Sequence, residues 1–275
     1  MSYKVTTLIT TDKAVANNDS RLSICLRSNG FSFSITSTDN VLYTLGETEC
    51  DLSLPMGETV SLIKSFFAEQ GINTLNIAQM RLIVPSLHSV WIPDGLYDPA
   101  RDKQYLQMMA RPERESSICH IHSQPMEAYM VFSTPLAVTT AFKVALPGID
   151  IHSQHSVLVN ELTLKKSLGH PCLLMHVRDG MADYEAFYDG HLLLSNTLTA
   201  TDNNECLYHA LGFMKQLHME TPDMELAICG QVNRDIYGLL QHYFPSVTLY
   251  TGRPYTFLNP EFQTLHTYRH ALLLS

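Results

Sequence analysis

Residues 172–201 read CLLMHVRDGMADYEAFYDGHLLLSNTLTAT, and residues 21–50 read RLSICLRSNGFSFSITSTDNVLYTLGETEC. Each stretch holds three apolar or alternating runs that are separated by two short turns. Asn29-Gly30 lies in the first turn of the earlier stretch, and Asp179-Gly180 and Asp189-Gly190 are the turns of the later one. Asn-Gly and Asp-Gly pairs between alternating runs indicate β-hairpins, because both residues adopt positive φ readily. Each stretch therefore predicts a three-stranded antiparallel meander.

The similarity of the two stretches continues into the residues that follow them. Amphipathic helices are expected at 58–72 and 203–218, strands at 80–86 and 225–230, and second helices at 99–110 and 233–244. Apolar residues three and four positions apart indicate the helices, and short apolar runs indicate the strands. Each half of the chain then has the order β-β-β-α-β-α. An internal repeat of this kind indicates a duplicated fold.

The boundary between the halves is expected at Gly169-His170-Pro171, which interrupts helical patterning immediately before the second meander. Residues 1–168 would form the first half, enlarged by insertions, and residues 169–275 the second. The polar segment 110–125 is expected to be a surface loop or a hairpin of the first half. The last segment, 260–274, is expected to form a helix that closes the second half.

The composition of the chain excludes several classes of protein. Its 275 residues are 45% hydrophobic and 16% charged, which suits one large or two smaller globular domains and argues against disorder. The chain has 18 Lys and Arg against 27 Asp and Glu, and the net charge of −9 argues against nucleic acid as a partner. No apolar run suits a signal peptide or a membrane span, so we expect a cytoplasmic protein without membrane insertion. The six cysteines are spaced singly and are expected to be reduced.

The repeated meander, helix and strand pattern resembles the actin, hexokinase and Hsp70 ATPase superfamily, which has a duplicated ribonuclease H-like fold. The second phosphate motif of that superfamily is Asp-x-Gly-x-Gly-Thr-Thr-Asp, and residues 176–183, HVRDGMAD, align with it without a gap. Residues 226–231, LAICGQ, resemble the strand and Gly-Gly adenosine motif, with Gln231 in place of the second glycine. The chain is similar to actin-like proteins of type IV pilus assembly and to a Bacteroidetes-type family of unknown function. This resemblance implies an α/β fold with mixed sheets and two ribonuclease H-like halves.

The resemblance also implies a nucleotide cleft between the halves. Its candidate binding residues here are Arg27, Arg178, Asp179, Gly180, Asp183 and Gly230. The motif departs from the superfamily, because Cys25 and His176 replace the first Asp in the two halves, and Arg27 and Arg178 replace the following Gly. Phosphoryl transfer needs Mg²⁺ at the phosphates, and a thiol or an imidazole is a poor ligand for that ion. We therefore expect that the fold is retained and the ATPase machinery is lost, so no catalytic residue is predicted.

The two arginines at the glycine positions have two interpretations. Arg27 and Arg178 could clamp an anion from symmetric positions, since a guanidinium forms bidentate bonds with phosphate or carboxylate. Alternatively, each arginine pairs with a nearby carboxylate such as Asp179 or Asp183, and the cleft binds nothing. The second interpretation is the one we expect.

The histidines raise the separate question of a metal site. His120 and His122 are two residues apart, a spacing that places both imidazoles on one face of a strand, and His152 and His155 lie in a related segment. The chain has 13 histidines, so such spacings also arise by coincidence. No third pair of ligands has a recognised spacing, and we predict no metal site.

Two functions remain open from the sequence. The first is a non-catalytic actin-like scaffold that binds a protein partner or a second copy of itself and needs no cofactor. The second is a divergent protein that binds ATP and Mg²⁺ through Arg178 and the turn at Cys229-Gly230-Gln231, with or without slow hydrolysis. A small-molecule kinase fits less well, because Asp is missing at the superfamily's positions.

Overall fold

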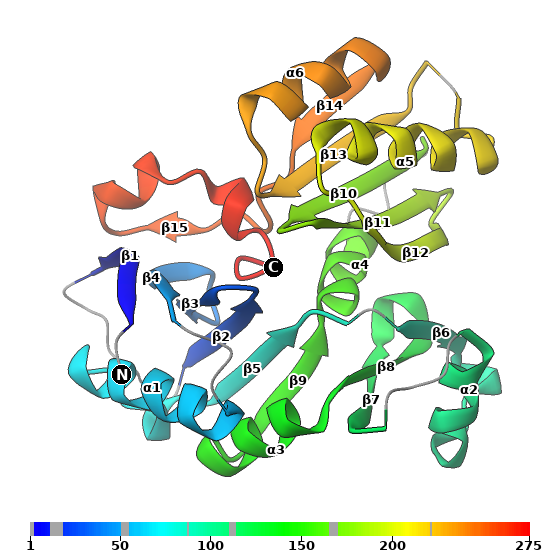
Figure 1. The fold of residues 1–275 in the computed structure, drawn as a ribbon. Helices are drawn as coiled ribbons and strands as arrows, with labels where there is room; N and C mark the ends of the chain where they lie inside the picture. The colour runs from blue at the N-terminus through cyan, green and yellow to red at the C-terminus, as the bar shows by residue number, and fades with distance from the viewer. Residues whose placement is uncertain are drawn as a thin grey trace. The chain divides into compact units, whose positions relative to one another are not determined.

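The computed structural model describes residues 3–11, 19–50, 55–86, 88–109, 114–164, 170–220 and 222–275. The chain forms two compact units, which we describe separately (Figure 1). Unit 1 comprises Met1–Gln154 and Pro254–Leu265, and unit 2 comprises His155–Arg253 and His266–Ser275. The boundary expected between residues 168 and 169 lies outside the described residues and stays a prediction. Within the described ranges, no helix has the length and apolar character needed to cross a membrane.

Unit 2 is built on a five-stranded mixed sheet with the order β12-β11-β10-β13-β14. Its strands are β10 (Cys172–Arg178), β11 (Met181–Tyr188), β12 (His191–Thr199), β13 (Glu225–Gly230) and β14 (Ser246–Leu249). The first three form the expected antiparallel meander, and β13 and β14 add in parallel. Gly180 and Gly190 take φ values of +68° and +75° in its turns, which explains why glycine follows aspartate at both places.

The helices α5 (Asn203–Gln216) and α6 (Arg234–Tyr243) pack on one face of this sheet. Odd-numbered residues of β10 such as Met175, together with Tyr184 of β11, face these helices in a shared apolar core. Because successive strand residues point to opposite faces, His176 and Asp183 lie on the other face. The helix α4 (Gln154–Leu164) contributes His155 there, since its imidazole hydrogen-bonds Glu185 and Thr197.

Unit 1 contains a seven-stranded sheet with the order β1-β4-β3-β2-β5-β9, in which β15 also pairs with β4. The strands are β1 (Lys4–Thr10), β2 (Ser20–Arg27), β3 (Gly30–Ser37), β4 (Val41–Glu49), β5 (Gln79–Val84), β9 (Ile149–Ser153) and β15 (Thr256–Phe257). The series β4-β3-β2-β5-β9 matches β12-β11-β10-β13-β14 strand for strand. The helices α1 (Met56–Glu69) and α3 (Leu136–Ala145) pack on its core face. The predicted duplication of the strand and helix pattern is therefore confirmed.

One helix assignment in the first half was wrong. Residues 99–109 of the expected helix form a 3₁₀ turn and the helix α2 (Asp102–Met109), which packs on a separate three-stranded sheet. That sheet has the order β6-β8-β7, with β6 (Ser89–Pro93), β7 (Ser116–Ser123) and β8 (Ala128–Pro135). The helix that corresponds to α6 is α3, because it lies between β5 and β9 as α6 lies between β13 and β14. The insertion has its own amphipathic helix, and periodicity alone cannot distinguish it from the repeated one.

The expected helix at 260–274 was also wrong. Two short 3₁₀ helices, η5 (Pro260–Thr264) and η6 (Thr267–His270), stand in its place. Leu265 and His266 between them have ψ values of 138° and 82°, which are not helical and break the run. Leu272, Leu273 and Leu274 are nevertheless buried, so the apolar pattern came from burial and not from helix formation.

Candidate functional site

The hairpin formed by β10 and β11 carries the residues that align with the second phosphate motif. His176 pairs directly with Asp183 across the two strands, and Asp179-Gly180 form the exposed turn between them. His176 donates from Nδ1 to Oδ2 of Asp183 at 2.9 Å. Arg178 donates to the same carboxylate from Nε at 2.9 Å and from Nη2 at 3.0 Å, in a bidentate ion pair. The pairing of β10 with β11 therefore brings His176 and Arg178, which stand at the two substituted motif positions, into contact with Asp183, the last aspartate of the motif.

Asp183 is fully buried, and its carboxylate accepts hydrogen bonds from at least four donor atoms. The fourth donor is the hydroxyl of Thr197 on β12, at 2.6 Å from Oδ1. Burial by itself would raise the pKa of Asp183. The hydrogen bond from His176 and the positive charges of His155 and Arg178 outweigh burial and hold the pKa well below its usual range. The side chain is therefore a permanent anion at neutral pH.

The hydrogen bonds continue from Thr197 to a second buried pair. The imidazole of His155 lies 2.8 Å from the Thr197 hydroxyl through Nε2 and hydrogen-bonds Glu185 through Nδ1. The single hydroxyl hydrogen of Thr197 is given to Asp183, so Nε2 of His155 must be the donor in this contact. Nδ1 shares a hydrogen with the Glu185 carboxyl group, and burial raises the pKa of Glu185 as well.

The electrostatic environment of His155 favours its charged form. Burial alone would lower the pKa of His155, but the charge and hydrogen bond of Glu185, with the nearby charge of Asp183, raise it above its ordinary value. The network then pairs Asp183 with Arg178 and couples His155 to Glu185. Hydrogen bonds and opposite charges within the network compensate the burial of these groups.

Gly230, at the end of β13, lies against His176. It has φ +85°, and a Cβ atom at this position would lie 2.1 Å from the carbonyl oxygen of Val177 and 2.8 Å from Cδ2 of His176. The next residue, Gln231, donates its backbone N–H to the same carbonyl at 2.7 Å. The imidazole of His176 therefore occupies the space beside the turn that resembles the adenosine motif.

The corresponding hairpin of unit 1, between β2 and β3, has a simpler arrangement. Arg27 donates from Nη1 to Oε1 of Glu47 on β4 at 2.7 Å, and both side chains are about one fifth exposed. Cys25 is half-buried and is a reduced thiol. In each unit, then, the arginine pairs with a carboxylate. Asp183 was one of the two partners that the sequence suggested for Arg178, whereas the sequence did not suggest Glu47 as the partner of Arg27. The joint anion site of Arg27 and Arg178 stays a prediction.

The family of the chain follows from its comparison with known proteins. A family model described as "Protein of unknown function (DUF3822)" matches residues 10–247. The chain belongs to this family. A search of curated proteins finds no match.

Two solved structures share the fold of this DUF3822 chain. One is a Bacteroides thetaiotaomicron protein of unknown function with an actin-like ATPase fold, at a TM-score of 0.75 and 20% identity, over 96% of this chain and 99% of that one. The other is a PilM–PilN type IV pilus biogenesis complex, at a TM-score of 0.57 and 11% identity, over 95% and 97%. At these identities the comparisons show the fold alone, an actin-like ATPase fold.

The histidines that suggested a metal site have separate partners. Both His120 and His122 lie on β7 of the inserted sheet. Nδ1 of His120 lies 2.8 Å from Oδ2 of Asp102, and Nε2 of His122 lies 3.0 Å from Oδ2 of Asp94. His155 belongs to the buried network of unit 2. His152 is half-buried, and burial with the nearby charge of Arg81 lowers its pKa to about 4. Across the ranges that the structure describes, no three metal-ligating side chains converge.

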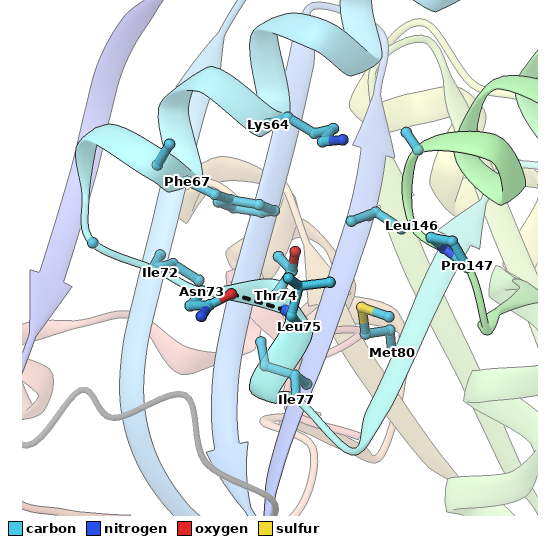
Figure 2. Close-up of a pocket in the computed structure, with 13 residues that line it drawn as sticks. Lys64, Phe67, Ile72, Asn73, Thr74, Leu75, Ile77, Met80, Leu146 and Pro147 are labelled. Atoms are coloured by element: carbon cyan, nitrogen blue, oxygen red, sulfur yellow. Dashed lines mark hydrogen bonds between the residues drawn. The ribbon is translucent and has the colours of Figure 1, made fainter.

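Unit 1 also has an apolar groove of about 620 Å³, which lies among the end of α1, the start of β5 and the end of α3 (Figure 2). Phe67, Ile72 and Leu146 line it, and Lys64 is the one charged side chain among its lining residues. The Asn73 side chain accepts a hydrogen bond from the backbone N–H of Leu75 at 3.1 Å. The lining is mostly apolar, and Lys64 is its one titratable side chain, so the groove has no pair of groups for acid–base chemistry.

Sequence reasoning missed three members of the buried network. Glu185 lies in an alternating stretch of β11, and Thr197 follows two other polar residues in β12, and both patterns are also found in solvent-facing strands. His155 was noted only as a possible metal ligand. The sequence did contain one signal for this network. Asp183 and Glu185 are two residues apart in a strand, so both carboxyl groups lie on one face, and they need cations nearby if that face is buried.

Proposed function

We propose that this DUF3822 chain is a non-catalytic, partner-binding protein in which the ancestral phosphate hairpin has become a structural ion-pair network. The observation that carries the proposal is the saturation of Asp183. A carboxylate offers about four lone-pair sites, and His176, Arg178 and Thr197 supply four donors to them. All of these lone-pair sites of the Asp183 carboxylate are therefore occupied, and none is left for another ligand.

Mg²⁺ with a nucleotide does not fit these residues. Mg²⁺ needs oxygen ligands in near-octahedral geometry, and Asp183 could supply one only by releasing Arg178, His176 or the Thr197 hydroxyl. Breaking a buried ion pair costs about 3–5 kcal/mol, because the partner charge is left uncompensated. Arg178 also stands where the superfamily has a glycine that allows close approach of phosphate. We therefore infer that the chain uses no ATP or Mg²⁺ in its function.

The partner that we propose is a protein, either another chain or a second copy. The fold supports this choice, since one protein that shares it has been solved as a PilM–PilN complex. The six cysteines are all reduced thiols, four of them buried, and reduced thiols favour a reducing compartment. These thiols support our proposal that the protein functions in the cytoplasm.

A thermal-unfolding scan with and without ATP and Mg²⁺ tests the proposal. A ligand present at 100 times its Kd would stabilise the native state by about 2.7 kcal/mol, or roughly 5–10 °C for a chain of this size. We expect no shift at millimolar nucleotide beyond that of a salt control matched in ionic strength. An ATP-induced shift that requires Mg²⁺ would instead support the divergent ATP-binding function and contradict this proposal.

A further inference from the structure

The strand β12 forms one edge of the unit 2 sheet and pairs only with β11 among the described residues. Its nine residues, HLLLSNTLT, include no Lys, Arg, Asp, Glu or Pro. Edge strands are usually protected by charge, by proline or by a covering segment, because their free edge accepts further strands. This edge has neither of the first two protections. Two of its main-chain groups have side-chain partners, since the Thr197 N–H donates to Oδ1 of Asn196 at 2.9 Å and His209 Nε2 lies 3.1 Å from the Thr199 carbonyl oxygen, and an added strand would replace these two contacts.

The duplicated fold shows how the same edge is covered in unit 1. The counterpart of β12 is β4, which also has nine residues. β1 pairs antiparallel with β4 from Thr44 to Glu49, and β15 pairs with it at Val41 and Leu42. No strand in the part of unit 2 that the structure describes corresponds to β1 or β15 (Figure 1).

The helices beside these edges also correspond, residue by residue. Both α1 and α5 have 14 residues. Aligned without a gap, Thr59, Val60 and Ile63 of α1 match Cys206, Leu207 and Ala210 of α5, and all six are buried. The same alignment matches Phe66 with Phe213 and Glu69 with Gln216.

Tyr3, the residue just before β1, packs on this part of α1. Its ring meets Phe66 edge to face at 5.3 Å, and its hydroxyl hydrogen-bonds Glu69. Leu8 of β1 also packs against the unit 1 core. The covering strand therefore contributes an aromatic and an aliphatic side chain to the helix face, besides its backbone hydrogen bonds.

In unit 2 the corresponding place is an open groove of about 390 Å³ along α5. Phe213 and Gln216, the counterparts of the two residues that hold Tyr3, both line it, as does Leu198 of β12. Phe66 is fully buried, whereas Phe213 is only partly buried, and Tyr208 on the rim is 74% exposed. The groove and the strand edge are continuous through Leu198.

We propose that β12 and this groove bind an extended segment of a partner protein, which adds antiparallel along Leu194–Thr199 and places an aromatic side chain between Phe213 and Gln216. Strand addition of this kind takes affinity from main-chain hydrogen bonds and specificity from side-chain pockets. The inference rests on the proposed partner-binding function, and it defines the surface and the chemistry of the partner.

The charges around the groove specify the partner further. In unit 1, Lys4 of β1 lies 3.9 Å from Glu49 of β4. In unit 2, Thr199 replaces Glu49, and Lys215 in the groove lining replaces Ala68 of α1. The sign of the local charge is thus reversed, so the bound segment should carry an acidic residue directly after its aromatic one.

A labelled peptide tests this surface by fluorescence anisotropy against the full chain. The probe is residues 2–11, SYKVTTLITT, with Lys4→Glu, and the comparison peptides are the unchanged sequence and the probe with Tyr3→Ala. We expect the probe to bind and the unchanged peptide to bind up to about five-fold more weakly. The Tyr3→Ala peptide should bind about ten-fold more weakly than the probe, since buried aromatic anchors dominate such interfaces.

Gly212 allows the groove to be blocked without harming the fold. It lies within α5 and lines the groove, and a Cβ atom there meets nothing within 4 Å. Gly212→Glu should weaken the probe about ten-fold or more, by filling the groove and repelling the acidic residue. Gly238→Glu in α6, another helical glycine with open space, is the matched control and should not change binding. Both variants should unfold at or above the wild-type temperature, because glycine is a poor helix former.

Each outcome decides the proposal. The proposal would be overturned if the probe did not bind, or if it bound Gly212→Glu and Gly238→Glu equally well. Equal binding to the two variants would indicate that the peptide binds at β4 of unit 1, in place of β1. A wild-type dimer in light scattering that Gly212→Glu makes monomeric would assign the edge to a second copy and overturn the choice of partner. The ATP scan is independent of all these results, so failure of the peptide alone removes this surface and leaves the proposed function in place.

Discussion

Replacing Asp183 by asparagine tests whether the β10–β11 hairpin is held by its ion pairs. The carboxylate is fully buried and accepts from His176, Arg178 and Thr197. Asparagine has nearly the same shape but only one acceptor oxygen, and its amide hydrogens would point at donors. The change removes charge and hydrogen bonds while leaving no cavity.

The expected loss of stability follows from burial. Removing one member of a buried ion pair costs about 3–5 kcal/mol. The Arg178 side chain is 22% exposed and can reach water, so we expect the lower end, about 3 kcal/mol. For a chain of this size that corresponds to roughly 6–12 °C in the unfolding temperature. Urea unfolding of wild type and Asp183→Asn at neutral pH measures the difference.

The pH dependence of this difference has a defined sign. The folded pKa of Asp183 is depressed, so its contribution is complete above the unfolded value of about 3.9 and is lost as pH falls below it. The gap between wild type and Asp183→Asn should therefore shrink in acid. Glu47→Gln, which removes the partly exposed pair of Arg27, is the control and should cost at most about 1 kcal/mol. A loss below about 1 kcal/mol for Asp183→Asn, or a gap that does not depend on pH, would refute the buried network.

Two further predictions concern the neighbours of Asp183. The pKa of His155 is raised by Glu185, so its contribution is present below the unfolded value of about 6.5 and is lost as pH rises through the folded one. Urea unfolding between neutral and alkaline pH should show this decline in wild type and not in Glu185→Gln; equal slopes would contradict the raised pKa of His155. Gly230→Ala should cost about 3 kcal/mol, from positive φ and the contact with the Val177 carbonyl. Gly180→Ala, with positive φ but open space, should cost only about 1–2 kcal/mol in the same assay.

The repeated pattern at 21–50 and 172–201 was sufficient to predict the two meanders and the duplicated fold. Hairpin turns depend on local backbone preferences, and the residues that satisfy them, such as Gly180 and Gly190, are visible in the sequence. The assignment of α2 failed because a helix in an inserted subdomain has the same periodicity as one in the repeated core. Which sheet a helix covers depends on long-range packing, which no local pattern reports.

The candidate site was predicted only in part, for a similar reason. The alignment with the phosphate motif identified His176, Arg178 and Asp183, and their contacts follow from adjacent strands of one hairpin. His155 is 28 residues before Asp183 in the chain and reaches it through a hydroxyl of β12. That relation exists only after α4 and three strands are assembled. The existence of a buried counter-charge could be inferred from the sequence, but its identity could not.

The substitutions at positions 176 and 178 are best understood together with Asp183. If a metal no longer neutralises the motif's last aspartate, burying that carboxylate becomes costly unless nearby cations or donors replace the ion. His176 donates one hydrogen bond, Arg178 donates two and brings a full positive charge, and both come from the strand that pairs with Asp183. A reversal of either residue alone should therefore not restore nucleotide binding, because it would unbalance the network before it created a metal site. The same reasoning separates the two parts of unit 2 in our proposal: the hairpin face contributes stability, and recognition is assigned to the β12 edge and its apolar groove.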